Sequence, residues 1–498
     1  MIISHDLGTT GNKATLVDAD GQVVASATEG YPVDFGSGGK AEQDAEHWWD
    51  AVCTATRRLL ERVPGAAGQV AGVSFSGQMM GAVLTDGTGD PVRPAIIWAD
   101  TRSTAQTDQL IERIGMDAGY RITGHRLNPT YSLTKVMWVR DTEPDVFARA
   151  RHVLLAKDFI VYRLTGQRVT DPSDASSTNA FDQAAGDWSA ELIEAAGLDR
   201  ALFPEVVPST TVVGTVTGWA AARTGLTEGT PVVLGGGDGP MGALGAGIVD
   251  AADGAYTYLG SSSWVSLAAD APLHDPLMRT MTFNHVVPGR YVPTATMQAG
   301  GASLQWIMET LAPGDETRYE RLLAGVAKVQ AAADGLYFLP HLLGERSPYW
   351  NPRARAVFAG LARHHGPEHL TRAVVEGVGF NLYTGLLAFN QNSVDGTRIE
   401  RIDAIGGAAN SEPLLRIFAD LWGIPVWRRN LVDEATALGA AVVGGVGVGL
   451  FDGFDIARRM SRRTLECPPD PAAHERFLGE YELFMDAYRR IEPWFDSL

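Results

Sequence analysis

The chain has 498 residues, of which 45% are hydrophobic and 20% are charged, so disorder, collagen and coiled coil are excluded as its main architecture. The length allows about two to four domains. The net charge of −18 argues against nucleic acid or an anionic membrane as the main partner. Cys53 and Cys467 are expected to be buried thiols. Because no signal peptide and no apolar run of about 18 residues is found, we expect a soluble cytoplasmic protein.

Strands and helices alternate along the first part of the chain, which is typical of the α/β class. Asp44 or a neighbouring residue is the expected cap of the first helix. Apolar patterning and turn residues predict strands at 2–3, 14–17, 23–25 and 70–75, and helices at 45–62 and 103–114.

A second region repeats the plan of the first. A strand, a turn of small residues and another strand at 256–267 follow the same order as residues 2–17. The sequence therefore predicts two domains, 1–247 and 248–498. Each begins with a hairpin whose turn can face a phosphate.

The turn DLGTTGNK, residues 6–13, is rich in groups that bind phosphate. Its glycines let backbone N–H groups turn inward, Thr9 and Thr10 add hydroxyls, and Lys13 adds a positive charge. Asp6 ends the strand, where a carboxylate can hold a hydrated Mg²⁺ ion. The turn fits the β- and γ-phosphates of a nucleotide. The alternative is a polar turn whose threonines bond their own backbone.

Asp238 stands in the run GGGDGP, between a buried strand at 232–234 and a helix of small residues at 241–248. Ligands of α/β folds bind at the carboxyl ends of strands, and a carboxylate there can accept the proton of an attacking hydroxyl. The alternative is that Asp238 only caps the helix. Residues 237–242 also match G-x-G-x-x-G, but Asp253 precedes the next strand instead of ending it, so a nicotinamide-dependent oxidoreductase is the weaker interpretation.

Two further segments permit a ligand without requiring one. GGAANS at 406–411 precedes a helix at 412–421, and its small residues suit adenine and ribose or only a tight turn. IIWADTR at 96–102 brings an aromatic side chain, Trp98, close to Asp100. This arrangement can hold a sugar, or it can be a strand end with a salt bridge.

Taken together, these segments resemble the FGGY family of carbohydrate kinases, within the actin-like ATPase superfamily, and the bacterial xylulokinases are the most similar group. The resemblance runs through nearly the whole chain. The matching segments are DLGTTGNK (6–13), GQMMGAVL (77–84), AIIWADTR (95–102), YSLTKVMWV (131–139), LLAKDFIVYRLTG (154–166), DPSDASST (171–178), GGGDGPMGALGAG (235–247), LPHLLGERSPYWNP (339–352), GGAANS (406–411) and ALGAA (437–441).

The resemblance implies an ATP-dependent sugar kinase with two ribonuclease-H-like α/β domains and an active site in the cleft between them. It implies that Asp238 is the general base, that Asp6 and Asp238 are carboxylates for Mg²⁺, and that ATP is the phosphoryl donor. The implied nucleotide-side residues are Thr9, Thr10, Lys13, Ser261, Gly301, Gln305, Gly407 and Ser411. The implied sugar-side residues are Gln78, Met79, Met80, Asp100 and Asp238. A small-molecule sugar is the expected partner, and a homodimer is a family-level expectation.

D-xylulose, phosphorylated to D-xylulose 5-phosphate, is the first substrate that the resemblance implies. Met80 stands where many xylulokinases carry a histidine, and a thioether is a poor hydrogen-bond partner for a sugar hydroxyl. GSSS at 260–263 stands where GTSG is common, and His5 stands where an aliphatic residue is usual. The alternatives are therefore an FGGY kinase for ribulose, a tetrulose or a polyol such as xylitol and, from another class, a non-metabolic actin-like ATPase.

Overall fold

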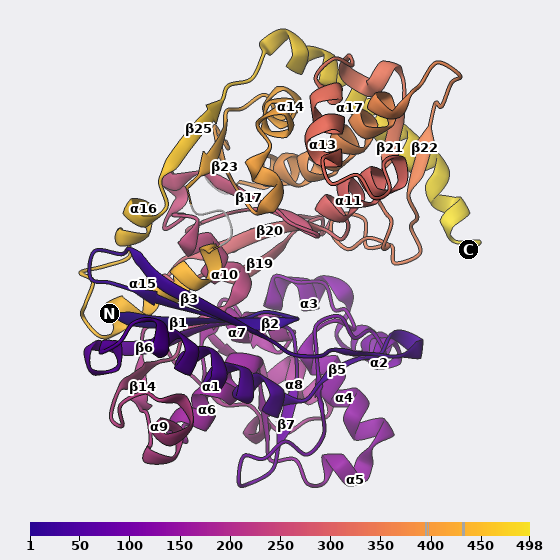
Figure 1. Cartoon of the computed structure of the whole chain (residues 1–498). Helices are drawn as coiled ribbons and strands as arrows, with labels where there is room; N and C mark the ends of the chain where they lie inside the picture. Colours follow the sequence, from indigo (N-terminus) through magenta and orange to yellow (C-terminus); the bar gives the residue numbers. More distant parts are fainter. Residues whose placement is uncertain (394–395, 397, 431–433) are drawn as a thin grey trace.

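The computed structural model of the chain describes residues 1–393, 396, 398–430 and 434–498. Figure 1 shows two lobes, one from the N-terminal half and one from most of the C-terminal half, with the helices α10 (Asp238–Gly245) and α15 (Ala435–Gly447) between them. Each lobe is built on one large mixed sheet with helices packed against it. The predicted α/β class with two domains is therefore confirmed.

The first sheet brings the predicted catalytic carboxylates to one edge. Its order is β14 (Val212–Thr215), β15 (Pro231–Val233), β6 (Gly72–Gly77), β1 (Ile2–Leu7), β2 (Gly11–Val17) and β3 (Val23–Gly30), with β16 (Gly236–Gly237) also paired to β6. The register sets Asp6 opposite Lys13 on β2 and opposite Ser76 on β6. Because β16 runs parallel to the same end of β6, the chain delivers Asp238 beside Asp6.

The second sheet repeats this arrangement. Its order is β19 (Met281–Asn284), β20 (Tyr291–Met297), β18 (Ser263–Leu267), β17 (Ala255–Leu259), β23 (Ile402–Ile405), β24 (Val426–Arg429) and β25 (Arg463–Cys467). β17 forms an antiparallel hairpin with β18 and pairs in parallel with β23, as β1 does with β2 and β6. The hairpin expected at the start of each half is confirmed, and the division at residues 247 and 248 stays a prediction.

Helices cover both faces of the first sheet. Successive residues of a strand point to opposite faces, and accordingly Ile3 packs in a core with α1 (Ala45–Arg62) and α6 (Ala156–Thr165), whereas Ile2 packs in a core with α15. Asp44 caps α1 as predicted, because its side chain accepts the N–H of Glu46. The other helices of this lobe are α2 (Thr104–Ile114), α3 (Met116–Thr123), α4 (Ser132–Thr142), α5 (Pro144–Phe147), α7 (Pro172–Ala175), α8 (Ala190–Ala196) and α9 (Gly218–Thr224).

The second lobe carries its longest helices on one side of its sheet in Figure 1. These are α11 (Gly300–Leu311), α12 (Arg318–Val326), α13 (Pro367–Asn392), α14 (Glu412–Trp422) and α17 (Pro471–Phe495), and the short α16 (Ile456–Met460) follows α15. Within the described ranges no helix is long and apolar enough to cross a membrane. Cys53 and Cys467 are buried and free, as predicted.

The helices α10 and α15 cross with their backbones in contact. A Cβ atom on Gly245 would lie 1.7 Å from the carbonyl oxygen of Ala435, and one on Gly439 would lie 2.1 Å from that of Met241. Real Cβ atoms do not approach so closely, so only glycine fits at these two positions. The crossing fixes the start of α10, and therefore Asp238, between the lobes.

Candidate active site

A pocket of about 310 Å³ lies between the two lobes. The first lobe contributes Thr9, Met79, Met80, Trp98 and Asp238 to its wall. The second lobe contributes Arg346 together with aromatic, hydroxyl and thioether side chains, which are Tyr256, Tyr258, Ser262, Trp264, Ser266, Met281, Phe283, Thr294 and Thr296. A pocket with a largely apolar wall and a few convergent polar groups is the usual form of a small-molecule site.

Asp238 is the first residue of α10, directly after β16, so the predicted position at a strand-to-helix junction is confirmed. Gly237 and not Asp238 takes the capping position of that helix. The Asp238 carboxylate accepts the N–H of Gly239 at 2.8 Å. Burial, followed by the negative charge of Asp6, raises the pKa of Asp238 from 3.8 to about 7. A carboxyl group with a pKa near neutrality is well matched to take a proton from a hydroxyl.

A hydroxyl group from the other half of the chain holds Asp6. Its carboxylate accepts a hydrogen bond from Thr436 on α15, and Ser76 on β6 lies opposite it in the sheet, while burial raises the pKa of Asp6. In the described ranges no group of three or more His, Cys, Asp or Glu side chains is arranged to hold a metal ion. Mg²⁺, however, is commonly bound through one or two carboxylates together with substrate phosphates and water. The oxygen atoms of Asp6 and Asp238 fit that mode of binding.

The turn between β1 and β2 is tight, since Gly8 donates its N–H to the carbonyl oxygen of Gly11 at 3.0 Å. Thr9 lines the pocket, and its hydroxyl oxygen accepts the indole N–H of Trp98 at 2.9 Å. Thr10 is exposed. The Lys13 ammonium lies 3.4 Å from a carboxylate oxygen of Glu434, so the turn also contacts the second half of the chain.

Of the sugar-side residues predicted around Met80, two line the pocket and one does not. Met79 and Met80 line it, whereas Gln78 is buried behind them. Gln78 donates from Nε2 to Gln43 at 2.9 Å, and its Oε1 is buried without a hydrogen-bond partner in the described structure. Met80 has a left-handed backbone conformation (φ 63°), which is uncommon outside glycine, and its N–H donates to Ser177 Oγ at 3.1 Å. This bond holds the backbone of Met80 in that conformation.

Asp100 is not among the residues that line this pocket. Its two oxygens accept the N–H of Ala41 at 2.8 Å and the Arg102 backbone N–H and Nε at 3.0 and 2.9 Å. The geometry is that of a strand end with a salt bridge, the alternative stated for this segment. Contact between Asp100 and a sugar stays a prediction.

A second pocket, of about 790 Å³, adjoins the first at Tyr258, which lines both. All five nucleotide-side residues predicted in the second half line it, namely Ser261, Gly301, Gln305, Gly407 and Ser411. Gly301 lies in the first turn of α11, where a Cβ atom would be 2.4 Å from the carbonyl oxygen of Gly260. Ser411 caps α14 by accepting the N–H of Leu414. Two helix beginnings and a close backbone approach fit the adenosine part of a nucleotide.

A buried ion cluster supports the turn before Asp238, and no role had been assigned to it from the sequence. Lys157 is fully buried at ion-pair distance from three carboxylates, those of Asp158, Asp171 and Asp174. Asp171 accepts the hydroxyl of Ser173 at 2.5 Å, and Ser173 Oγ accepts the N–H of Gly237 at 3.0 Å. Both runs that form the cluster, LLAKDFIVYRLTG and DPSDASST, were recognised as family motifs. Their spacing in the sequence, however, does not predict that their charged side chains meet.

His5, for which the sequence offered no explanation, is a buried neutral side chain. Burial lowers its pKa to about 4, so it carries no charge near neutral pH. Its Nδ1 lies 3.2 Å from the side-chain amide of Asn12, its Nε2 lies 3.3 Å from Thr56 Oγ1, and its ring stacks on Phe75. His5 therefore ties β1 to β2, β6 and α1 beneath the phosphate-facing turn.

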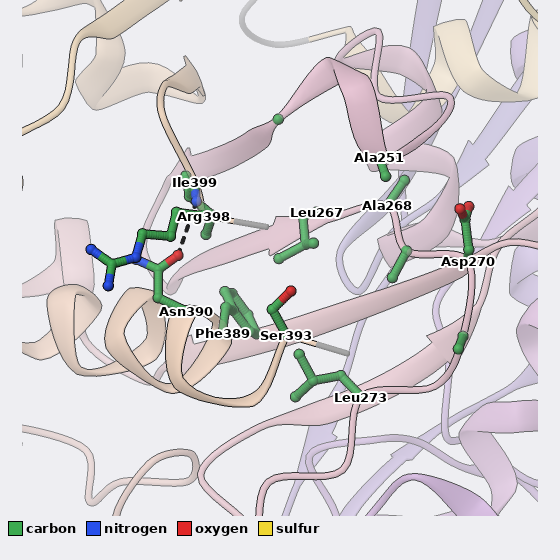
Figure 2. A pocket seen from close by; sticks show the side chains of 13 residues that line it. Ala251, Leu267, Ala268, Asp270, Leu273, Phe389, Asn390, Ser393, Arg398 and Ile399 are labelled. Atoms are coloured by element: carbon green, nitrogen blue, oxygen red, sulfur yellow. Dashed lines mark hydrogen bonds between the residues drawn. The ribbon is translucent and has the colours of Figure 1, made fainter. Parts of the chain in front are cut away.

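Another hollow, of about 200 Å³, lies away from the cleft beside the C-terminal end of α13. Figure 2 shows Leu267, Leu273 and Phe389 around it, and the backbone N–H of Ile399 donating to Asn390. None of the predicted site residues lines this hollow. The chemistry predicted from the sequence therefore gathers in the two adjoining pockets and not here.

Comparison with known proteins identifies the class of enzyme. Residues 1–245 match the N-terminal domain of the FGGY family of carbohydrate kinases, and residues 255–448 match its C-terminal domain. The chain therefore belongs to the FGGY family and is a sugar kinase. Family membership replaces the oxidoreductase and the non-metabolic ATPase interpretations.

Individual relatives cover nearly the whole chain. The xylulose kinase of Escherichia coli (strain K12) is 34% identical over 99% of this chain and 99% of its own. The gluconokinase of Bacillus subtilis (strain 168) is 30% identical over 100% of this chain and 97% of its own. The crystal structure of xylulose kinase from Rhodospirillum rubrum is 31% identical and has a TM-score of 0.90 over 99% of each chain.

Proposed function

We propose that this chain transfers the γ-phosphoryl group of ATP to a hydroxyl of D-xylulose, forming D-xylulose 5-phosphate and ADP. The observation that carries the proposal is the position of Asp238, whose carboxylate faces a pocket of sugar size next to a larger pocket suited to adenosine. Xylulose kinases aligned over nearly the full chain support this substrate.

Asp238 acts as the general base. A sugar hydroxyl is a weak nucleophile, and its proton must leave as the new P–O bond forms. With a pKa of about 7, the Asp238 carboxylate is ionised in a large share of molecules at neutral pH and still basic enough to accept that proton. The proton moves to the carboxylate, the hydroxyl oxygen attacks phosphorus, and the bond to the β-phosphate oxygen breaks.

The turn at 6–13 binds the phosphates. Backbone N–H groups of the turn and the hydroxyls of Thr9 and Thr10 donate hydrogen bonds, and the ammonium of Lys13 adds positive charge. Asp6, with Asp238 next to it, would hold Mg²⁺. When bound, this ion would neutralise charge on the phosphate oxygens. The hydrogen bond from Thr436 keeps the Asp6 carboxylate in place for that contact.

The nucleotide and the sugar bind on opposite sides of Tyr258. Ser261, Gly301, Gln305, Gly407 and Ser411 surround the adenosine part of ATP. Met79 and Met80 bound the sugar, and Gln78, next to them in the chain, has a buried Oε1 that could accept a hydrogen bond from a sugar hydroxyl. Apolar packing around the reacting hydroxyl keeps water, the competing acceptor, out of the site.

The test is ADP release from Mg-ATP with a panel of D-xylulose, D-ribulose, a tetrulose, xylitol and D-gluconate, run with the wild type and with Asp238→Asn. We expect the highest kcat/KM for D-xylulose and a loss of about 1,000-fold or more in kcat for Asp238→Asn. A variant within a few-fold of wild type would rule out Asp238 as base. ATP hydrolysis that no sugar stimulates would contradict the proposed reaction.

A further inference from the structure

Arg346 brings a positive charge from the second lobe into the pocket between the lobes. It lies in the connection between β21 (Tyr337–Leu339) and β22 (Val357–Ala359), and it lines the pocket with Asp238. Its guanidinium carbon lies 5.5 Å from the centre of the Trp98 ring, which belongs to the first lobe. Trp98 in turn donates its N–H to Thr9 of the first lobe. The guanidinium of the second lobe therefore packs against side chains of the first.

The guanidinium has donors to spare. Among the residues that the structure describes, no side chain or carbonyl forms a hydrogen bond or ion pair with it, and its Nε is buried without a partner. The neighbouring carboxylate of Glu345 is engaged elsewhere, with the N–H of Gln298 at 2.9 Å and with His341 and Asn381. A buried donor without an acceptor is costly, so a ligand that supplies acceptor oxygens would complete this site.

The surroundings of Arg346 belong to the sugar side of the pocket. Its charge acts on Tyr131, Lys135 and Asp238, and Lys135 donates to the carbonyl oxygen of Met80 at 3.1 Å. The hydroxyl of Thr296, which lines the same pocket, is also buried without a partner. The pocket that Met80 lines therefore also contains two polar groups without hydrogen-bond partners, Arg346 Nε and the Thr296 hydroxyl.

We propose that Arg346 is a substrate-binding residue that donates hydrogen bonds to oxygens of the sugar next to the reacting hydroxyl. This inference rests on the proposed function. The planar fork of a guanidinium suits two neighbouring oxygen acceptors, and it supplies the donor that a thioether at position 80 lacks. Because Arg346 and Asp238 belong to different lobes, a sugar that contacts both also joins the lobes.

The test compares steady-state kinetics of the wild type with Arg346→Met and Arg346→Lys. Arg353→Met is the matched control, since Arg353 lies in the same connection, is exposed and pairs with Asp496. We expect Arg346→Met to raise the KM for the sugar about 10- to 100-fold, and to change the KM for ATP much less. Arg346→Lys should recover part of the loss, and Arg353→Met should match the wild type. Thermal unfolding and calorimetric binding of D-xylulose, each without nucleotide, accompany the kinetics.

Each outcome separates this inference from the reaction itself. Wild-type turnover of D-xylulose with an unchanged sugar KM in Arg346→Met would overturn the inference and leave the proposed reaction standing. A lower kcat at unchanged sugar KM would also overturn it and would assign the guanidinium to the transferred phosphoryl group. If the wild type neither binds nor phosphorylates any sugar of the panel, both proposals fail. Weaker calorimetric binding of the sugar to a folded Arg346→Met variant supports the inference directly.

Discussion

Asp238→Asn removes a carboxylate that folding brings beside another carboxylate, that of Asp6. In the folded protein, burial and this neighbouring charge raise the pKa of Asp238 from 3.8 to about 7. The folded state therefore holds the proton more tightly than the unfolded state. Stability contributed by this proton is fully present below the unfolded pKa and is lost as the pH rises towards 7. Asparagine, which has no such proton, retains the neutral state at every pH.

The pKa difference sets the size of the effect. A change of one pKa unit corresponds to about 1.4 kcal/mol, so a rise from 3.8 to about 7 corresponds to about 4 kcal/mol above neutral pH. Water reaches the side chain through the pocket and reduces this value. We expect Asp238→Asn to raise the free energy of unfolding by about 2–4 kcal/mol near pH 8, which for a chain of this length is about 2–4 °C in melting temperature.

The assay is thermal unfolding without Mg²⁺ or nucleotide, in chelating buffer, at about pH 5 and about pH 8. The gain in free energy of unfolding from wild type to Asp238→Asn should be about a third as large at pH 5 as at pH 8. At pH 5, Asp238 of the folded wild type is still mostly protonated. Asp108→Asn, on the exposed side of α2, serves as the control and should show no such trend. A difference that is equal at both pH values, or that favours the wild type at pH 8, would refute the reasoning.

Three further predictions concern stability and nucleotide binding. Lys157→Met leaves three buried carboxylates without their cation and should cost about 3–5 kcal/mol in denaturant unfolding; a loss below about 1 kcal/mol would show that the cluster reorganises or protonates. Gly301→Ala puts a Cβ atom 2.4 Å from the Gly260 carbonyl oxygen, and should raise the KM for ATP more than the KM for the sugar. Gly245→Ala puts a Cβ atom 1.7 Å from the Ala435 carbonyl oxygen, and should lower the melting temperature by several degrees, or prevent folding, which expression and calorimetry would reveal.

Local patterns in the sequence predicted the elements that carry the reaction. The strand before the phosphate-facing turn, helix 45–62 with its Asp44 cap and the junction at Asp238 all follow from apolar spacing, capping and small residues, which act over a few positions. The closeness of Asp6 to Asp238 is different, since it depends on the pairing of β1 and β16 with the same strand. Sheet order brings together residues far apart in the chain, and no local pattern encodes it.

The sequence was least informative where a side chain acts through a distant neighbour. Arg346 occurs in a recognisable run, but its approach to Trp98 depends on how the two lobes meet. Asp100 is of a residue type that often binds sugars, yet its oxygens already accept hydrogen bonds from Arg102 and from a backbone amide. Whether a carboxylate faces a ligand or a neighbouring arginine is decided by backbone direction, and residue type alone does not contain that information.

The packing of α15 makes the two halves of the chain inseparable. Leu438, Val442 and Val443 on this helix share one core with Ile2 of β1 and with α10. A fragment that stopped at residue 247 would leave one face of its sheet open to water, and a fragment that began at 248 would carry an apolar helix with nothing to cover it. The sequence has two tandem units, but each half completes part of its core with residues of the other. A recombination event that transferred one half alone would therefore transfer an incomplete core.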